Sequence, residues 1–347
     1  MKSSSDRILT THTGSLPRSK TLSALLVKRE QRKPYDENAL RTEIDRNLDL
    51  VVARQRECGV DIGNDGETPR VGFSTYTTER IAGFGGESRR KPTLDTIKFP
   101  GFADFMARQI GVSDELARVW NAPQAVGKLE YDQSLSEAKS ESAAFKASLK
   151  RTGSKFTEDF MTAATPGIVS TTMLLAPNNP AYKNDAEYVM GIANELKKEY
   201  EYIVGEGYIL QLDAPDLAME RVIMFGDQPL KSFLDRVALH VDAINVAIAD
   251  IPPEKVRLHV CWGNWNGPHQ DDVDVADLLP ILYGAKVGAL SIPLGNPRPP
   301  KPSNQQDRPA PYISRYLQSS NSSFLFSDFQ HILYFRNRFK LPNKLVR

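Results

Sequence analysis

Residues 208–213 decide the fold, and they read Tyr208-Ile209-Leu210-Gln211-Leu212-Asp213. Four of the five residues before the aspartate are apolar, so the segment is predicted to be a short buried strand that ends in a carboxylate. A helix precedes it, because Asn184 can begin a segment whose apolar residues recur at helical spacing as far as Gly205. A helix that leads directly into a buried strand predicts one repeat of a parallel sheet.

The same alternation of helix and strand extends in both directions along the chain. Upstream, Asp36 can cap a helix that runs to Gly59 and is followed by a short strand over residues 60–63. Downstream, the alternation repeats twice, and the predicted helices and strands are residues 229–250, 256–262, 273–285 and 287–293. This order predicts an α/β fold with a parallel sheet. Residues 85–160 are more polar, and we expect long loops and exposed helices there.

Polar residues gather where the predicted strands end, namely Asp65 and Glu67, Asp213, and His259 with Cys261. In a (β/α)8 barrel these strand ends meet on one face, where the active site lies. A doubly wound open sheet would also bind ligands at strand ends, but no G-x-G-x-x-G sequence follows the first strand. We therefore predict a (β/α)8 TIM-type barrel over residues 1–298 that is incomplete at its C-terminal end.

The composition is that of an ordinary globular protein, with 40% hydrophobic and 25% charged residues among 347. A net charge of +1 gives no reason to expect nucleic acid or an acidic membrane as a partner. Two cysteines make a disulfide framework unlikely to be the basis of stability and favour a reducing compartment. No apolar run approaches the roughly 18 residues of a membrane span, so we expect a cytoplasmic protein.

Residues 299–347 differ from the rest of the chain. They carry eight Lys or Arg against two acidic residues, a net charge of +6, which leaves −5 for residues 1–298. They also contain six prolines and show no sustained period. We expect an atypical basic tail that is either disordered or an artefact of the gene model. A genuine basic extension that binds a partner is the alternative.

The pair His259 and Cys261 is the strongest candidate for a metal site. Residues two apart in a strand point to the same face, so the imidazole and the thiolate would aim at one point, as half of a zinc site needs. The polar and aromatic continuation through Trp262 and Asn264 favours the wall of a cleft. From spacing alone, a core cysteine beside a hydrogen-bonded histidine is an equal alternative.

Three further positions can bind a ligand. Gly14 lets the backbone approach a ligand, so the amides of Gly14 and Ser15 could bind a carboxylate, although a plain turn has the same pattern. Glu67, with Asp65, could anchor an amino group or a polar heterocycle, and Asp213 could hold a substrate ammonium. The structural alternatives are loop solvation or a salt bridge with Arg70 for the first two, and a neighbouring arginine for Asp213.

Taken together, these segments resemble the catalytic domain of the cobalamin-independent methionine synthase family and its short single-domain relatives. The resemblance covers roughly residues 8–298. The matching motifs occur in the same order and are His12-Thr13-Gly14-Ser15-Leu16-Pro17, Asn64-Asp65-Gly66-Glu67, Gln211-Leu212-Asp213-Ala214-Pro215, His259-Val260-Cys261-Trp262-Gly263-Asn264, Ala289-Leu290-Ser291-Ile292 and Asn296-Pro297-Arg298.

The resemblance implies transfer of a methyl group from a reduced folate to the thiol of homocysteine, held on zinc by His259 and Cys261. It implies that Gly14 and Ser15 hold the carboxylate of the amino acid. It also implies that Glu67 and Asp213 are the catalytic residues and hold the ammonium group, with Glu67 near the folate. The other candidate substrate-binding residues are His12, Trp262 and Asn264.

Two departures from the family pattern concern the metal. The third zinc ligand of the family is a glutamate where this chain has Pro293, and no cysteine follows Cys261 to serve as the fourth. We therefore predict weak activity or none for the chain as written. The rival functions are alkyl transfer to another small thiol, decarboxylation by the related porphyrinogen barrel family, and ligand binding without turnover.

Overall fold

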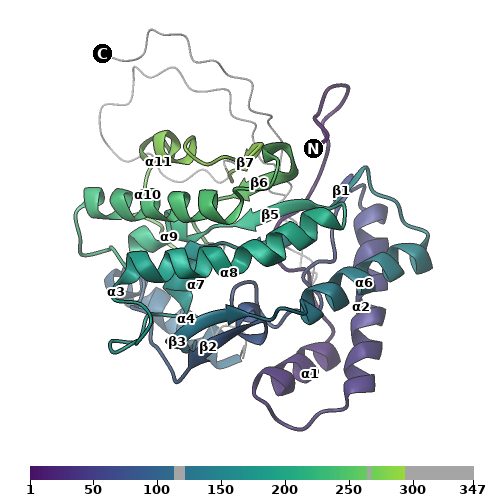
Figure 1. Ribbon diagram of the computed structural model, residues 1–347, viewed down its shortest axis with the longest axis horizontal. Helices are drawn as coiled ribbons and strands as arrows, with labels where there is room; N and C mark the ends of the chain where they lie inside the picture. Colours follow the sequence, from purple (N-terminus) through teal and green to yellow (C-terminus); the bar gives the residue numbers. More distant parts are fainter. Residues whose placement is uncertain (113–121, 264–266, 294–347) are drawn as a thin grey trace.

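A curled, five-stranded parallel sheet lies at the centre of the molecule, in the order β1-β4-β5-β6-β7 (Figure 1). The computed structural model describes residues 1–112, 122–263 and 267–293. Thr11 forms one further parallel bridge, to Ile62 of β1. The strands are β1 (Ile62–Gly63), β4 (Glu158–Ala164), β5 (Ile209–Asp213), β6 (Val256–His259) and β7 (Ala289–Ser291).

The two faces of the sheet differ in polarity, because successive side chains of a strand point to opposite faces. Met161, Leu210 and Leu258 belong to the main hydrophobic core, together with the helices that cover this face. The opposite, concave face carries alternate residues of the same strands, which the register places side by side. It begins with a small apolar cluster that includes Phe160 and Ile209, and it becomes polar toward the carboxyl ends of the strands.

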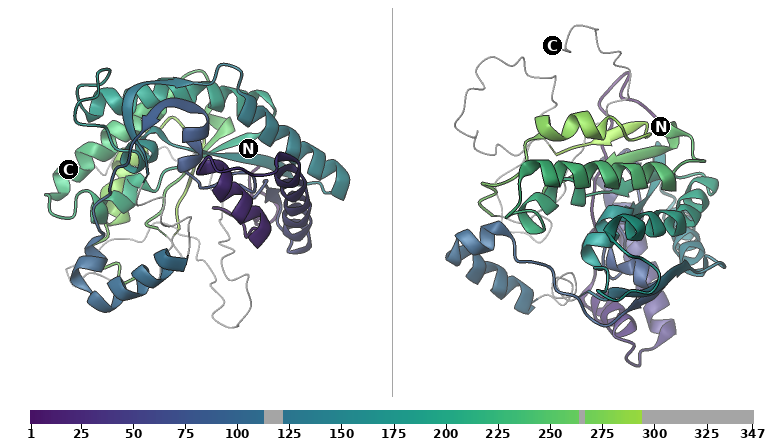
Figure 2. Two further views of the ribbon diagram at one scale, coloured as in Figure 1. Left: turned by 90° about the horizontal axis from the view of Figure 1, so that it is seen from below. Right: turned by 60° about the vertical axis from the view of Figure 1, so that its left-hand side comes forward.

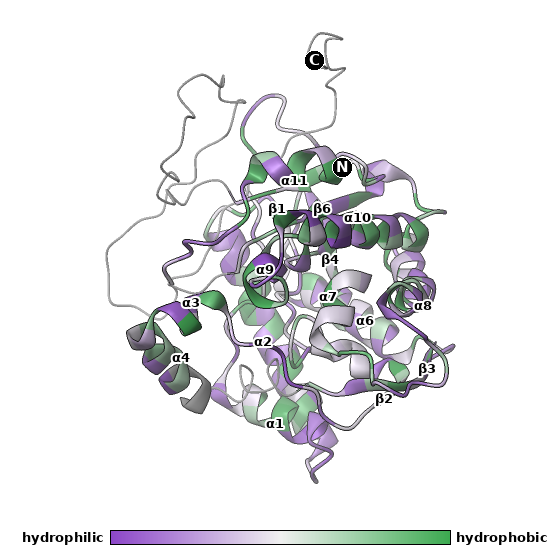
Figure 3. Ribbon diagram, turned by 90° about the vertical axis from the view of Figure 1, so that its left-hand side faces the viewer, coloured by the Kyte–Doolittle hydropathy of each residue, from purple (hydrophilic) through white to green (hydrophobic). Residues whose placement is uncertain are grey.

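Helices cover the convex face, and Figure 2 shows that sheet and helices together form an arch. Helices α8 and α10 lie side by side over β5 and β6 (Figure 1). Helix α10 carries both hydrophilic and hydrophobic residues along its length (Figure 3), as expected for an amphipathic helix. The helices are α1 (Lys20–Glu30), α2 (Glu37–Glu57), α3 (Leu94–Lys98), α4 (Pro100–Val112), α6 (Ser136–Thr152), α7 (Pro166–Thr172), α8 (Asp185–Gly205), α9 (Asp216–Ile223), α10 (Leu230–Ala247) and α11 (Val275–Leu282), with the 3-10 turns η1 (Thr75–Glu79) and η2 (Pro253–Lys255).

The local signals in the sequence place the helix ends correctly. The Asp36 carboxylate accepts hydrogen bonds from the first-turn amides of α2, and Asn184 does the same for α8. Gly59 and Gly207 follow these helices with φ of +78° and +97°, a region that favours glycine. The predicted strand over residues 256–262 is shorter than expected, because the ladder of β6 ends at His259.

Residues 85–160 differ most from the prediction. They contain α6 and the first three residues of β4, and β4 is a central strand of the sheet. Strand β2 (Ile81–Gly85) also pairs antiparallel with β3 (Gln124–Tyr131), with an irregularity between Ala82 and Phe84. Strand β4 begins with Glu158 and Asp159, although its last five residues are buried. Because of this polar start, the strand was not predicted from the sequence.

The prediction of an α/β fold built on a parallel sheet is confirmed, and the described strands form a curled half-barrel. The eightfold count of a closed barrel stays a prediction. The expected tail, residues 299–347, lies outside the described residues. Within residues 1–112, 122–263 and 267–293, no helix is long and apolar enough to cross a membrane.

Candidate functional site

The carboxyl ends of three neighbouring strands bring polar side chains together on the concave face. The register pairs Asp213 of β5 with His259 of β6, and His259 with Ser291 of β7. Register partners on parallel strands project to the same face about 4.8 Å apart. The sequence prediction that Asp213 and His259 lie near one another is therefore matched by the sheet.

His259 ends β6 on the concave face, beside its register partner Asp213. Cys261 follows two residues beyond the end of the strand and is half-buried. Val260 and Trp262, on either side of Cys261, belong to the main hydrophobic core. His259 is buried, and this burial together with the charge of Arg257 lowers its pKa to about 3. The imidazole is thus neutral, which is the form that can bind a metal.

The described residues supply an incomplete set of metal ligands. A catalytic zinc ion usually has three protein ligands and one open position. Across residues 1–112, 122–263 and 267–293, no three His, Cys, Asp or Glu side chains are grouped so as to hold a metal ion. Pro293, at the position of the family's third ligand, offers no donor side chain. His259 and Cys261 alone do not fit a complete zinc site.

The loop over residues 12–15 lies against the end of β5 and against Glu67. The Ser15 hydroxyl donates to Glu67 Oε2 at 2.5 Å. The amide of Gln211 donates to Thr13 Oγ1 at 3.0 Å and to Asp213 Oδ1 at 2.9 Å. Gly14 has a φ of +82°, and an added Cβ would meet no atom within 4 Å. The backbone at Gly14 is therefore open to a ligand, as the motif predicts.

Glu67 and Asp213 form an acidic pair at the inner end of this loop. Burial, and next the charge of Glu67, raise the pKa of Asp213 to about 8. Glu67 is fully buried, and its Oε1 atom has no hydrogen-bond partner among the described residues. A buried acceptor without a donor is costly, so a donor from a ligand would stabilise it. A cation at this point would also relieve the repulsion between the two carboxylates.

The remaining predicted residues lie in different places. His12 is buried with its ring 5.9 Å from that of Phe160, on the floor of the concave face. Trp262 is buried in the main hydrophobic core, where its indole donates to Val273 O at 2.9 Å. Asn264 lies outside the described residues.

Three residues of the concave face were missed by sequence reasoning. Gln211 is fully buried and links Thr13 to Asp213. The Arg257 guanidinium lies 3.8 Å from the centre of the Phe160 ring. Ser291 is buried beside His259. A period-two count would have found two of them, because Gln211 and Arg257 each stand two residues before a predicted site residue.

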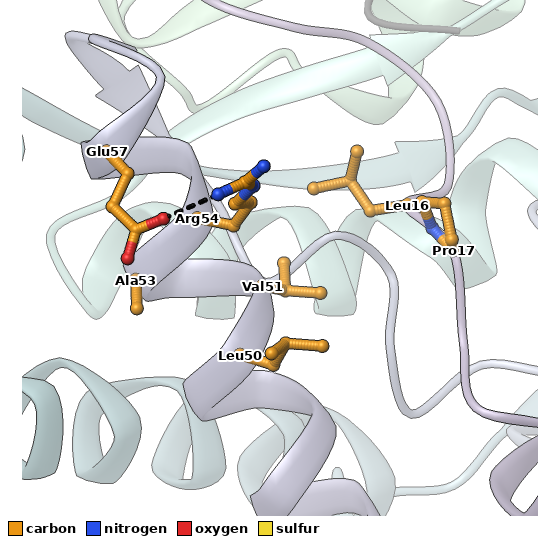
Figure 4. Close-up of a pocket in the computed structure, with 7 residues that line it drawn as sticks. All are labelled: Leu16, Pro17, Leu50, Val51, Ala53, Arg54 and Glu57. Carbon is orange, nitrogen blue, oxygen red and sulfur yellow. Dashed lines mark hydrogen bonds and ion pairs between the residues drawn. The ribbon is translucent and has the colours of Figure 1, made fainter. Parts of the chain in front are cut away.

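A cleft of about 270 Å³ lies between the segment of Leu16 and Pro17 and helix α2 (Figure 4). Leu16 and Pro17 form one wall, and α2 forms the other. At its edge Arg54 donates to Glu57 at 2.8 Å. The cleft is mostly apolar and holds none of the predicted site residues.

Comparison with known proteins finds similar sequences among the methionine synthases. No family model matches the chain. A methionine synthase from Pyrococcus furiosus is 29% identical over 308 residues, covering 82% of this chain and 75% of that protein. A methionine synthase from Thermococcus kodakarensis is 26% identical over 312 residues, covering 83% and 77%.

Among solved structures, a B12-independent methionine synthase from Shewanella sp. W3-18-1, in complex with selenomethionine, is similar with a TM-score of 0.48 and 19% identity. That match covers 74% of this chain and 62% of the Shewanella protein, and similarity at this level carries no functional argument. The two archaeal sequences do carry one, because each is matched over most of its own length. The chain is a homologue of the methionine synthases, as its motifs predict.

Proposed function

We propose that this chain is a methyltransferase that moves a methyl group from a reduced folate to the sulfur of homocysteine. Its homology to methionine synthases supports the reaction class. The acidic pair of Glu67 and Asp213 supports an amino acid as the substrate. Two buried carboxylates with an unfilled acceptor favour a bound ammonium group.

In the proposed binding mode, the acidic pair binds the ammonium group of the amino acid and the loop over residues 12–15 binds its carboxylate. The ammonium group lies between Glu67 and Asp213. The open backbone at Gly14 and Ser15 takes the carboxylate, because successive backbone N–H groups bind anions. The side chain of the substrate then extends toward His259, the register partner of Asp213, and toward Cys261 just beyond it.

The transfer itself breaks one bond and forms another. The thiol loses its proton and becomes the nucleophile, because the thiolate is the reactive form. An S–CH3 bond forms while the N–CH3 bond of the folate breaks, and the folate nitrogen keeps the electron pair and takes a proton from a general acid. The chain's own residues bind and orient the two substrates. The thiol gives up one proton and the folate nitrogen takes one, so the transfer balances in protons and leaves Glu67 and Asp213 to bind the ammonium group.

We further propose that His259 and Cys261 are the residues of the described chain that would contact a zinc ion, although these two alone do not make a complete site. Zinc, when bound, would stabilise the substrate thiolate at neutral pH. The half-barrel is proposed to be part of a (β/α)8 barrel over residues 1–298, with residues 299–347 as a separate tail.

Calorimetry with L-methionine tests the amino-acid site without depending on turnover. We expect Glu67→Gln and Asp213→Asn each to weaken binding about tenfold or more, since a hydrogen bond to a charged group contributes roughly 1.5–3 kcal/mol. Glu57→Gln is the matched control, because Glu57 is an exposed carboxylate paired with Arg54. It should leave the affinity unchanged.

The same protein, supplied with homocysteine, a methyl-folate and zinc, tests the reaction. Slow methionine formation supports the proposal. Methionine binding without turnover would instead favour a homologue that only binds ligands. Equal affinity of the wild type and both acidic-pair variants would reject the amino-acid site altogether.

A further inference from the structure

We propose that Arg18 is a positioning residue that fixes Glu67 through the backbone of its turn. The inference rests on the proposed function, because it concerns the carboxylate that is proposed to hold the substrate ammonium. The guanidinium of Arg18 donates to the main-chain carbonyl oxygens of Glu67 and Thr68.

Glu67 lies in a backbone conformation that needs support. Its φ is +55°, in the left-handed region that non-glycine residues rarely occupy. Such residues persist where surrounding contacts hold them, and they cluster at ligand sites. Gly66, just before it, is also left-handed with a φ of +64°. Two consecutive left-handed residues turn the chain sharply and direct the Glu67 side chain inward, where it is fully buried.

Arg18 holds this turn from outside. Its Nη2 atom donates to Glu67 O at 2.8 Å, and its Nε atom donates to Thr68 O at 3.2 Å. Two donors on one planar group fix two successive peptide carbonyls relative to each other. Within the turn, the Glu67 amide donates to Asp65 Oδ1 at 2.9 Å. The peptide on each side of the Glu67 Cα atom is therefore held.

The segment that carries Arg18 is itself anchored to α2. The next residue, Ser19, caps α1, and its amide donates to Asn47 Oδ1 at 2.8 Å. Asn47 is buried in α2 and returns a hydrogen bond to the Ser19 hydroxyl at 3.2 Å. Two residues before Arg18, the Leu16 amide donates to Gly66 O at 3.0 Å. Arg18 thus connects a rigid helix pair to the Glu67 turn.

This arrangement couples the two ends of the proposed amino-acid site. The loop that offers Gly14 and Ser15 and the turn that offers Glu67 move as one unit, because Leu16, Ser15 and Arg18 each bond across them. Loss of the Arg18 contacts would let Glu67 relax toward an ordinary backbone conformation. Its carboxylate would then leave the position from which it faces the substrate ammonium.

A double-mutant cycle tests the inference, with L-methionine as the probe and calorimetry as the measurement. Arg18→Lys keeps the charge but cannot hold two carbonyls in a fixed geometry. We expect it to weaken methionine binding about tenfold in the wild-type background. In the Glu67→Gln background it should have almost no further effect, because the group that Arg18 positions has already lost its charge.

Arg29→Lys is the matched control. Arg29 lies in the neighbouring helix α1 and donates to Pro69 O at 3.1 Å, in the same turn but beyond Glu67. It should lower the melting temperature as much as Arg18→Lys and leave methionine binding intact. If Arg18→Lys binds as Arg29→Lys does, or weakens binding equally in both backgrounds, the role of Arg18 is rejected. If Glu67→Gln itself leaves binding unchanged, the proposed amino-acid site fails first, and the role of Arg18 fails with it.

Discussion

The two halves of the concave face are built differently. The acidic half, with Glu67 and Asp213, is held by hydrogen bonds from Ser15, Arg18 and Gln211. The sulfur half, with His259 and Cys261, offers two donor atoms to a metal, and the described residues group no third His, Cys, Asp or Glu with them. One half is complete within the described residues, and the other is not.

This difference separates binding from chemistry. The acidic half needs only residues of the loop, the Glu67 turn and β5 to receive an amino acid. The sulfur half needs further ligands before it can hold zinc tightly, because affinity depends on ligand number. We therefore expect amino-acid binding to survive changes in the sulfur half, and zinc binding to survive changes in the acidic half.

The largest expected effect is on the ion network behind the acidic half. Glu141 is buried between Arg70 and Arg80, and these two cations lower its pKa to about 2. Its side chain is therefore a charged carboxylate near neutral pH. Glu141→Gln leaves two buried cations without their shared anion, so the free energy of unfolding should fall by about 3–5 kcal/mol. Urea denaturation measures this. Glu130→Gln, in an exposed pair with Lys128, should change it by less than about 1 kcal/mol.

The next effect is on stability and compares two left-handed glycines, Gly14 in the loop over residues 12–15 and Gly66 in the turn that carries Glu67. An alanine Cβ at Gly66 would lie 2.8 Å from Val51 Cγ1, whereas at Gly14 it would meet nothing within 4 Å. Gly14→Ala should cost about 1–2 kcal/mol of stability from the backbone alone. Gly66→Ala should cost more, because it adds overlap with packed side chains. Equal melting temperatures for the two variants would contradict the packing around Gly66.

The acidic half should also make stability depend on pH. The pKa of Asp213 rises from 3.8 to about 8 on folding, so between these values the folded chain holds more protons than the unfolded chain. Stability therefore falls as the pH rises through this range. Asp213→Asn removes this contribution, so its free energy of unfolding should decline less between about pH 5 and about pH 8. An unchanged slope would show that Asp213 ionises normally in the folded protein.

The smallest expected effect is on the affinity for L-methionine when a residue of the sulfur half is changed. His259→Ala should lower the zinc content measured by elemental analysis, since it removes one of two proposed ligands. The affinity for L-methionine should change by less than about threefold, because the ammonium acceptors remain in place. A tenfold loss of methionine affinity would mean that the two halves are one site and not two.

Local patterns in the sequence were sufficient for the frame of the fold and for several residues that meet at the strand ends. The caps at Asp36 and Asn184 and the carboxylate that ends β5 are short-range signals, and each lies where it was predicted. Strand β4 was missed because its first two residues are acidic, although its position between β1 and β5 is central. Trp262 was predicted at the cleft from its polar neighbours. Its side chain is buried in the main hydrophobic core.

Contacts between distant segments were beyond sequence reasoning. Nothing in the order of residues indicates that Arg18 reaches the carbonyl of Glu67, or that the Gln211 amide spans from Thr13 to Asp213. Such contacts depend on how the loop and the strand ends meet in space. The position of each site residue along the chain could be predicted, but the groups that hold it in place could not.

A crystal structure of the protein with L-methionine tests the central claim most directly. The account predicts the ammonium nitrogen within hydrogen-bonding distance, about 2.7–3.2 Å, of carboxylate oxygens of both Glu67 and Asp213. It also predicts the ligand carboxylate at the backbone of Gly14 and Ser15. A ligand whose ammonium group lies elsewhere, with the acidic pair left to each other, would contradict it.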